Sequence, residues 1–271
     1  MKKKRRYSGL RHHLRAHWPP YFLTYGAIMA TLLLIGFGLQ SQMWSIIPLA
    51  MALLILLGYF FSTALWAAYQ LHDDGGLVPH HKLFDMGKIR AGDSFVYIGA
   101  GLHDVPTALA QRLTTGQITA VNIYSLQWMP SKPLQRARQR SVQPAPDPRL
   151  KWQSGRLNLL PLPNESVQTV ILSQTALELH QRGDQVVLFK EIRRILAENG
   201  RFLLAERSRS QTNWVVMGLT AVPLPHTDHW RELLAETGFH LRTEQDLRGL
   251  ITCYRADKPT RDEARQLTLD L

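Results

Sequence analysis

The sequence predicts an α/β protein in which a transmembrane helical hairpin precedes a doubly wound, mostly parallel sheet whose last strand is antiparallel. Two long uncharged apolar runs near the N-terminus predict the hairpin. Strand-like and helix-like segments alternate from Ser94 onward, which is typical of a sheet with helices on both faces. A glycine turn, Gly99-Ala100-Gly101, follows the first of these strands and gives the sheet a Rossmann-like, nucleotide-binding character.

The two apolar runs span residues 21–39 and 45–69 and contain no Asp, Glu, Lys or Arg. Each is long enough for a helix that crosses about 30 Å of hydrocarbon. Aromatic residues gather at their ends, as at membrane interfaces: Trp18, Tyr21, Phe22, Trp44, Trp66 and Tyr69. Because a second run follows at once, a two-helix anchor explains the pattern better than a cleaved signal peptide does.

Charge is unevenly distributed along the 271 residues, whose formal net charge is +11. Residues 1–72 hold seven Lys and Arg and no acid, whereas residues 73–271 hold 25 Lys and Arg against 21 Asp and Glu. Lys and Arg mark the cytoplasmic side of membrane proteins. The sequence therefore predicts a multi-pass protein of the inner or plasma membrane with both termini cytoplasmic and the lipid bilayer as partner. Nucleic-acid binding is not expected, because aromatic side chains for base stacking do not accompany the basic stretches.

Five regions are predicted: a basic arm (1–20), two transmembrane helices (21–69), a linker and entry segment (70–90), the α/β domain (91–258) and a tail (259–271). The linker contains Gly-Gly and Pro. The lone cysteine, Cys253, excludes a disulfide framework and is expected in a buried strand. Histidines near residues 80 and 226–229 lack a third ligand at a fixed spacing, so no metal site is predicted.

Strands of the domain are expected where short apolar runs lie between turn residues. The expected strands are residues 94–99, 117–125, 149–155, 166–173, 201–207, 239–247 and 250–256.

Helices are expected between these strands. Asp104 would cap a helix that runs to about residue 113, and a short basic helix lies within residues 131–148. The clearest helix spans 183–200, with an apolar stripe and a closing glycine, and the next spans 227–238.

Two further motifs follow the glycine turn in order. The turn Leu-Pro-Leu-Pro occupies residues 160–163, and the segment EIRRILAENGRFLLAE occupies residues 191–206. In this order they resemble class I S-adenosylmethionine-dependent methyltransferases, from about Ser94 to Ala256. The resemblance implies S-adenosylmethionine as cofactor and a cofactor site along the ends of the first four strands. The residues it places there are Tyr97, Gly99, Ala100, Gly101, Asn122, Ile123, Arg156, Leu157 and Ser173.

Several of these positions depart from the family pattern. Tyr97 stands where the family has an acid near the methionine end of the cofactor, and Asn122 replaces the acid that holds the ribose. Arg156 lies at or beside the position of the acid near the adenine, and His103 replaces a third glycine. Loss of these charge-assisted hydrogen bonds would weaken cofactor binding by about 3–5 kcal/mol in total. An anionic ligand therefore becomes as plausible as a cationic one.

Three functions follow from this pattern. The first is a membrane-anchored methyltransferase whose acceptor is a lipidic or quinone-like small molecule, because the anchor confines the domain to the membrane. The second is a non-catalytic binding or scaffolding module with the same fold. The third is an NAD(P)-binding protein, which is disfavoured because Asp104 occupies the position of the third small residue of that fingerprint.

Two side chains after the fourth expected strand are candidates for acid–base roles. His180 could act as a general base, with Glu178 beside it, although a polar residue at a helix edge would look the same. The apolar segment 210–225 has three open interpretations: a lid over the site, a membrane-touching segment, or core packing.

Overall fold

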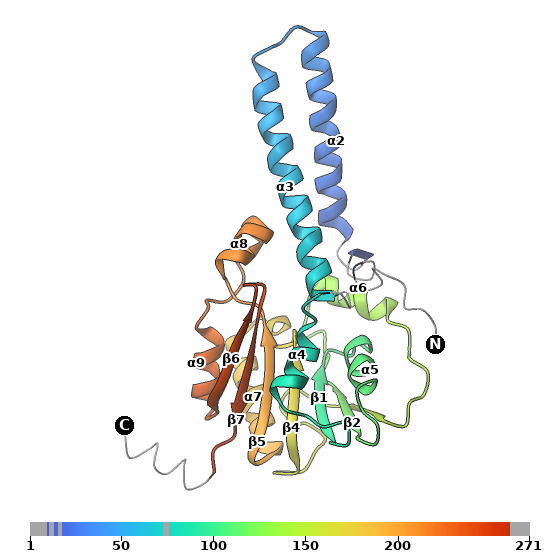
Figure 1. Ribbon diagram of the computed structural model, residues 1–271, viewed down its shortest axis with the longest axis vertical. Coiled ribbons are helices and arrows are strands. Elements are labelled where there is room, and N and C mark those ends of the chain that lie inside the picture. The colour runs from blue at the N-terminus through green and yellow to red at the C-terminus, as the bar shows by residue number, and fades with distance from the viewer. Residues whose placement is uncertain (1–9, 11–13, 16–17, 73–75, 261–271) are drawn as a thin grey trace. The chain divides into compact units, whose positions relative to one another are not determined.

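The computed structural model describes residues 10, 14–15, 18–72 and 76–260 and divides into two compact units (Figure 1). One unit comprises residues 1–78 and 211–223, and the other comprises residues 79–210 and 224–271. Most of the predicted basic arm and of the predicted tail lies outside the described residues. The segment 211–223 therefore groups with the N-terminal helices, although the sequence placed it inside the α/β domain.

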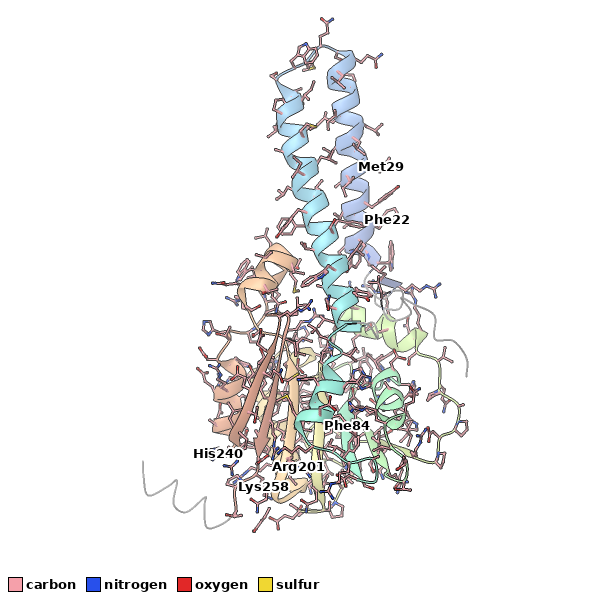
Figure 2. The ribbon with its side chains drawn as sticks, viewed as in Figure 1. Phe22, Met29, Phe84, Arg201, His240 and Lys258 are labelled. Carbon is pink, nitrogen blue, oxygen red and sulfur yellow. The ribbon has the colours of Figure 1, made fainter. Side chains whose placement is uncertain are left out.

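The first unit contains the predicted hairpin. Helices α2 (Trp18–Gln40) and α3 (Ile46–His72) pack against each other and have mean hydropathies of 2.0 and 2.2. In the most apolar 18-residue stretch of each helix, only 11% of α2 and 6% of α3 is buried. Side chains such as Phe22 and Met29 are exposed on α2 (Figure 2). By length and composition both helices can cross a membrane, and the predicted apolar helices are confirmed.

The second unit is built on one seven-stranded sheet with the order β3-β2-β1-β4-β5-β7-β6. The neighbours from β3 to β5 pair in parallel, whereas β7 is antiparallel to β5 and β6. The strands are β1 Phe95–Gly99, β2 Ile118–Asn122, β3 Leu150–Ser154, β4 Val167–Ser173, β5 Leu196–Glu206, β6 His240–Leu247 and β7 Ile251–Asp257. The predicted mostly parallel sheet with an antiparallel last strand is confirmed.

Helices flank the sheet. Helices α4 and α5 contact each other and the sheet, while α7 and α9 contact each other and supply side chains to the main core (Figure 1). The remaining helices are α4 Pro79–Met86, α5 Asp104–Ala110, α6 Lys132–Arg140, α7 Arg182–Ile195, α8 Gln211–Met217 and α9 His229–Glu236, with short 3₁₀ turns at η1 Ala176–Glu178 and η2 Gly218–Ala221.

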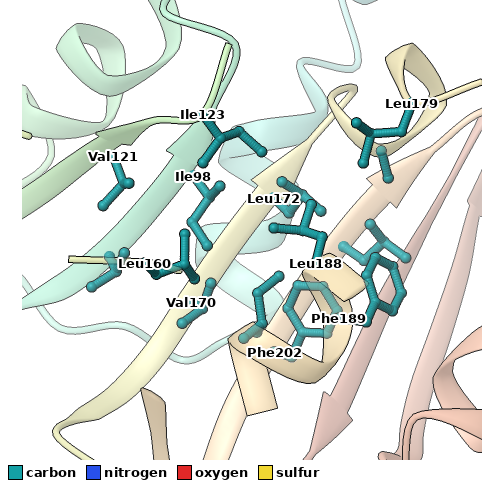
Figure 3. Close-up of a cluster of buried hydrophobic side chains, with 14 of the residues drawn as sticks. Ile98, Val121, Ile123, Leu160, Val170, Leu172, Leu179, Leu188, Phe189 and Phe202 are labelled. Carbon is teal, nitrogen blue, oxygen red and sulfur yellow. The ribbon is translucent and has the colours of Figure 1, made fainter. Parts of the chain in front are cut away.

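The main core lies between the sheet and α7 (Figure 3). Alternate residues of neighbouring strands, Ile98 on β1 and Val170 and Leu172 on β4, are fully buried there. Phe189 of α7 meets Phe202 of β5 edge to face, with ring centroids 5.0 Å apart. Phe189, Ile192 and Ile195 of the apolar stripe predicted for this helix fix it on the sheet. The predicted stripe is wrong at Val187, which is 38% exposed, and at Leu196, which belongs to β5.

The predicted linker is partly wrong, because α4 begins within it. Pro79 starts the helix, where its missing N–H costs least. Leu83 and Phe84 are buried against the sheet, and Phe84 meets Phe95 of β1 edge to face at 6.1 Å. Arg201 of β5 donates a hydrogen bond to the Gly87 carbonyl just after α4. Residues whose local sequence is typical of a linker thus form a helix because their side chains are buried against the sheet.

The end predicted for the helix at 183–200 is also wrong. Helix α7 stops at Ile195, and Leu196 already pairs with Val167 of β4. The pairing then shifts register, so that Arg201 lies opposite Thr169, and Asn199 takes a left-handed φ of 57° in the irregular stretch. Gly200 therefore belongs to a bulged strand and does not cap the helix. Gly238, with φ +78°, does end α9 as predicted.

Cys253 is fully buried on β7, as predicted. Burial raises the pKa of its thiol to about 12, so it stays a protonated, unreactive thiol at neutral pH.

Candidate functional site

The strand order creates a topological switch point between β1 and β4. The chain runs from β1 outward to β2 and β3, then returns to the other side of β1 with β4. At the carboxyl ends of these two strands lie Gly99 and Ser173. In open α/β sheets such a crevice is where ligands bind. The glycine turn predicted from sequence therefore occupies the ligand-binding edge of the sheet.

Both glycines of the turn are required by their neighbours. Gly101 has a φ of +77°, and a Cβ added there would overlap the Arg138 guanidinium and lie 2.8 Å from Asn122 Oδ1. A Cβ added at Gly99 would lie 2.6 Å from Cε1 of Tyr97, whose ring folds back along the turn. Neither position tolerates a side chain without local movement.

Arg138 of α6 occupies the space beside the turn. Its Nη1 donates hydrogen bonds to the Ala100 carbonyl and, at 3.5 Å, to Asn122 Oδ1. Its guanidinium carbon lies 3.8 Å from the centre of the Tyr124 ring, within the range of a cation–π contact. Burial lowers the pKa of Arg138, but a guanidinium keeps its charge at neutral pH. A cation therefore bridges the ends of β1 and β2, where the methyltransferases that the sequence resembles would have an acid that binds the ribose.

Helix α6 holds this arginine in place. Its first turn is capped by Ser131, whose Oγ accepts the Leu134 N–H at 3.5 Å. Leu134 and Ala137 are buried and fix the helix on the domain. Arg138 follows Ala137 directly, so its position beside the glycine turn is set by helix packing.

A pocket of about 220 Å³ opens next to Arg138, at the ends of β2 and β3. It is lined by Gly101, His103, Asn122, Gln143, Trp152, Gln153 and Ser154. The His103 ring meets Trp152 edge to face at 4.8 Å, and its Nδ1 lies 2.9 Å from Ser141 Oγ. The lining combines one large aromatic surface with amide, imidazole and hydroxyl groups. Such a set suits a heteroaromatic ring or a sugar.

A buried polar cluster lies at the ends of β4 and β5. Glu206 Oε1 accepts the backbone N–H groups of Thr175 at 2.7 Å and Ala176 at 2.6 Å. The Thr175 hydroxyl donates a hydrogen bond to the Ser173 carbonyl at 3.0 Å, and it interacts with the Tyr97 hydroxyl. Glu206 Oε2 and Ser173 Oγ are buried without a hydrogen-bond partner.

Two pKa values in this cluster are strongly shifted. Burial raises the pKa of Glu206 to about 8, although the backbone N–H groups oppose the shift. Burial, and next the Glu206 charge, raise the pKa of Tyr97 well above its usual range. At neutral pH the Glu206 carboxyl is therefore mostly protonated, and the tyrosine is neutral.

The predicted cofactor residues divide into three groups. Gly101 and Asn122 line the pocket. Arg156 is exposed in a tight turn, where it exchanges two backbone hydrogen bonds of 3.1 Å with Leu159, and it does not line the pocket. The others are buried at the strand ends behind the pocket: Tyr97, Gly99, Ala100, Ile123, Leu157 and Ser173.

The two acid–base candidates lie after β4. Burial raises the pKa of Glu178, and a hydrogen bond from Ser131 opposes the shift. His180 is exposed, and its Nδ1 lies 3.0 Å from the Glu178 carbonyl oxygen. Glu178 is thus the better-shielded proton-transfer group of the two. Among the described residues, no group of three or more His, Cys, Asp or Glu side chains is placed to hold a metal ion.

Sequence reasoning did not find Arg138. It offers Glu206, at the end of the fifth expected strand, as a candidate to replace the missing acids but cannot place its side chain. A signal for Arg138 exists in α6, where the buried positions Leu134 and Ala137 turn one side of a basic helix inward. Nothing in the local sequence distinguishes Glu206 from an ordinary polar residue at a strand end. Only the fold shows that this carboxyl is buried.

Comparison with known proteins agrees with this geometry. Residues 96–204 match the family model described as "Methyltransferase domain". A solved SAM-dependent methyltransferase from Aquifex aeolicus is similar, with 12% identity, a TM-score of 0.52 and coverage of 66% of this chain and 89% of that one. The [4+2]-cyclase SpnF is also similar, with 15% identity, a TM-score of 0.50 and coverage of 67% and 80%. At these identities the likeness shows the fold. A comparison with curated protein sequences found no match.

Proposed function

We propose that this chain, whose α/β unit is a class I methyltransferase-type domain, is a membrane-anchored S-adenosylmethionine-dependent methyltransferase. Its acceptor is a lipidic or quinone-like molecule at the cytoplasmic membrane face. The observation that carries the proposal is the glycine turn at the switch point of a sheet with this strand order, within the segment that matches the methyltransferase model.

The residues at the turn fit the cofactor in part. The Gly99–Gly101 turn lies at the switch point of the sheet, and the Asn122 amide, which lines the pocket, can hydrogen-bond a ribose hydroxyl. The carboxylates that would favour a cationic ligand are absent, and Arg138 fills the space beside Gly101. Cofactor binding therefore requires the Arg138 side chain to leave the Ala100 carbonyl. When bound, S-adenosylmethionine supplies a methyl group activated on a sulfonium.

The membrane anchor rests on α2 and α3. These helices expose so many apolar side chains that contact with water would be unfavourable. The seven N-terminal Lys and Arg residues favour a cytoplasmic N-terminus. Tethering keeps the domain near the bilayer, which raises the effective concentration of a membrane-resident acceptor over that of a soluble one. Methyl transfer to an activated acceptor needs mainly positioning, so the modest acid–base groups at Glu178 and His180 suffice.

Titration of the full chain in lipid nanodiscs tests the cofactor. S-adenosylmethionine and S-adenosylhomocysteine should bind in the micromolar range, with NADH as the negative control. The Gly101→Ala variant should bind at least tenfold more weakly, because the methyl group strains a left-handed backbone and adds bulk to the turn that the cofactor must approach. Gly183→Ala is the matched control, since no atom lies within 4 Å of a Cβ added there. Absence of binding at millimolar cofactor would overturn the proposal.

Transfer of a labelled methyl group identifies the acceptor class. The wild-type chain, incubated with methyl-labelled cofactor and total membrane lipid, should place label in the organic phase. Label found only in protein or in the aqueous phase would overturn the lipidic acceptor and leave the cofactor assignment intact.

A non-catalytic binding module with the same fold remains the second candidate. Arg138 in the crevice, with Tyr97 and Asn122 in place of acids, favours it. The similarity to a protein named as a cyclase is consistent with a fold that serves more than methyl transfer. An NAD(P)-binding function is not carried forward, because an antiparallel β7 lies between β5 and β6, whereas dinucleotide-binding sheets have the order 3-2-1-4-5-6.

A further inference from the structure

The segment 211–223, QTNWVVMGLTAVP, follows β5 and forms α8 and η2. It contains no charged residue. Four of its large apolar side chains are substantially exposed: Trp214 (40%), Val215 (50%), Leu219 (84%) and Val222 (48%). An uncharged surface segment that exposes this much apolar area marks an interaction site.

The segment packs on α3 within the hairpin unit (Figure 1). The chain passes close to α3 at Gly218, where a Cβ would lie 3.2 Å from the Phe60 ring. Gly218 has a φ of +56°, so glycine suits both the turn and the close approach. The exposed apolar surface of α8 and η2 is therefore continuous with that of a candidate membrane-spanning helix.

The place of contact on α3 indicates a depth. Two aromatic residues, Trp66 and Tyr69, stand at the cytoplasmic end of the apolar run. Phe60 precedes them by six and nine residues, or about 9 and 14 Å of helix. Amphipathic segments in the membrane interface bury their apolar side by about 5–10 Å. When the hairpin spans the bilayer, the contact therefore lies within this depth of the level of Trp66.

We propose that α8 and η2 form a third membrane contact, which inserts its apolar side into the lipid–water interface beside α3. The inference rests on the proposed membrane anchor and adds to it. The partner is the acyl and headgroup boundary of the bilayer.

The test places an environment-sensitive NBD probe at single cysteines in the full chain, reconstituted in phosphatidylethanolamine–phosphatidylglycerol vesicles. Native Cys253 is buried with a raised pKa and should not label, which the unmodified chain verifies. The probe sites are Leu219→Cys in η2, Ile55→Cys in the middle of α3, and Val142→Cys in the α/β unit. Val142 matches Leu219 closely, because both are apolar and their exposures are 83% and 84%.

The Leu219 probe should show blue-shifted emission, quenching by shallow spin-labelled lipid, and at least threefold weaker quenching by aqueous iodide than the Val142 probe. A second probe at Val215→Cys should behave as the one at Leu219 does. If the Ile55 probe is lipid-quenched while both segment probes match Val142 in iodide quenching, the inference is overturned and the anchor stands. If the Ile55 probe is itself open to iodide, the anchor fails and the inference fails with it.

Discussion

The two sides of β1 differ sharply in how their side chains are satisfied. Ile98 points into the core beneath α7, where it is fully buried among apolar groups. Its neighbour Tyr97 points to the opposite side and joins the polar cluster of Thr175 and Glu206. Adjacent residues of one strand thus belong to a dry apolar core and to a dry polar cluster.

The difference between the two sides of β1 shows where the fold tolerates an unfavourable free energy of burial. Burial of apolar side chains under α7 is favourable wherever the shapes fit. The polar cluster instead leaves Glu206 Oε2 and Ser173 Oγ buried without partners, and an unmade buried hydrogen bond costs about 1–3 kcal/mol. A cost retained at the ligand-binding edge of the sheet points to function, whereas the core beneath α7 serves stability.

The largest effect should come from breaking the apolar side. Phe189→Ala removes a fully buried ring that packs on Phe202 and should lower the free energy of unfolding by about 3–5 kcal/mol. Chemical denaturation of the full chain in detergent, followed by circular dichroism, measures the loss. Val187→Ala on the same helix is the control, because Val187 is 38% exposed and should cost much less. Equal losses in the two variants would contradict the assigned core.

Titration of Glu206 should give the next largest effect. Its folded-state pKa of about 8 lies above the ordinary value of 4.5, so folding favours the protonated carboxyl. This contribution to stability is complete below about pH 4.5 and is lost as pH rises through 8. Glutamine stays neutral at every pH. As pH rises from 5 to 9, the free energy of unfolding of Glu206→Gln should therefore increase by about 2–4 kcal/mol relative to that of the wild type.

Thermal or chemical unfolding at both pH values measures that gain. Glu198→Gln provides the control, because it makes the same change at an exposed position of the same strand. A Glu206→Gln variant whose stability difference from wild type does not change with pH would show that Glu206 is ionised throughout.

A smaller effect is expected where Arg138 meets the glycine turn. Arg138→Ala removes a cation that holds the Ala100 carbonyl and opposes a sulfonium ligand. Release of one charged hydrogen bond and a cation–π contact corresponds to about 1–2 kcal/mol, so S-adenosylmethionine should bind about tenfold more tightly. Calorimetric titration checks this, with Arg140→Ala as a control of equal charge at the exposed end of α6. Weaker binding in Arg138→Ala would mean that the arginine holds the ligand.

The same contrast explains which features the sequence predicted. Strands and the α7 stripe follow from local apolar periodicity, and both were predicted; the glycine turn follows from backbone chemistry at Gly99 and Gly101. The start of α4 was missed because burial of Leu83 and Phe84 depends on distant strands. The end of α7 was missed because pairing of Leu196 with Val167 overrides the helical pattern.

The candidate site was predicted less completely for the same physical reason. Position along the sheet follows from strand order, so the turn and Asn122 were found at the pocket. Arg138 reaches the turn from a different helix, and the raised pKa of Glu206 arises from the burial that the assembled fold imposes. Side chains that act through long-range contacts leave no periodic signal in the sequence.

The smallest effect on stability should come from an ion pair that is exposed to water, in contrast to the buried core and the buried polar cluster. Arg231 of α9 makes two hydrogen bonds of 2.7 and 2.9 Å to the Glu244 carboxylate of β6, and both residues reach solvent. Exposed ion pairs contribute about 0.2–1 kcal/mol because water screens them. A double-mutant cycle with Arg231→Ala and Glu244→Ala should give a coupling energy below about 1 kcal/mol that shrinks further in high salt. A coupling as large as the pH-dependent effect of Glu206 would mean that burial is not what separates the two kinds of polar contact in this fold.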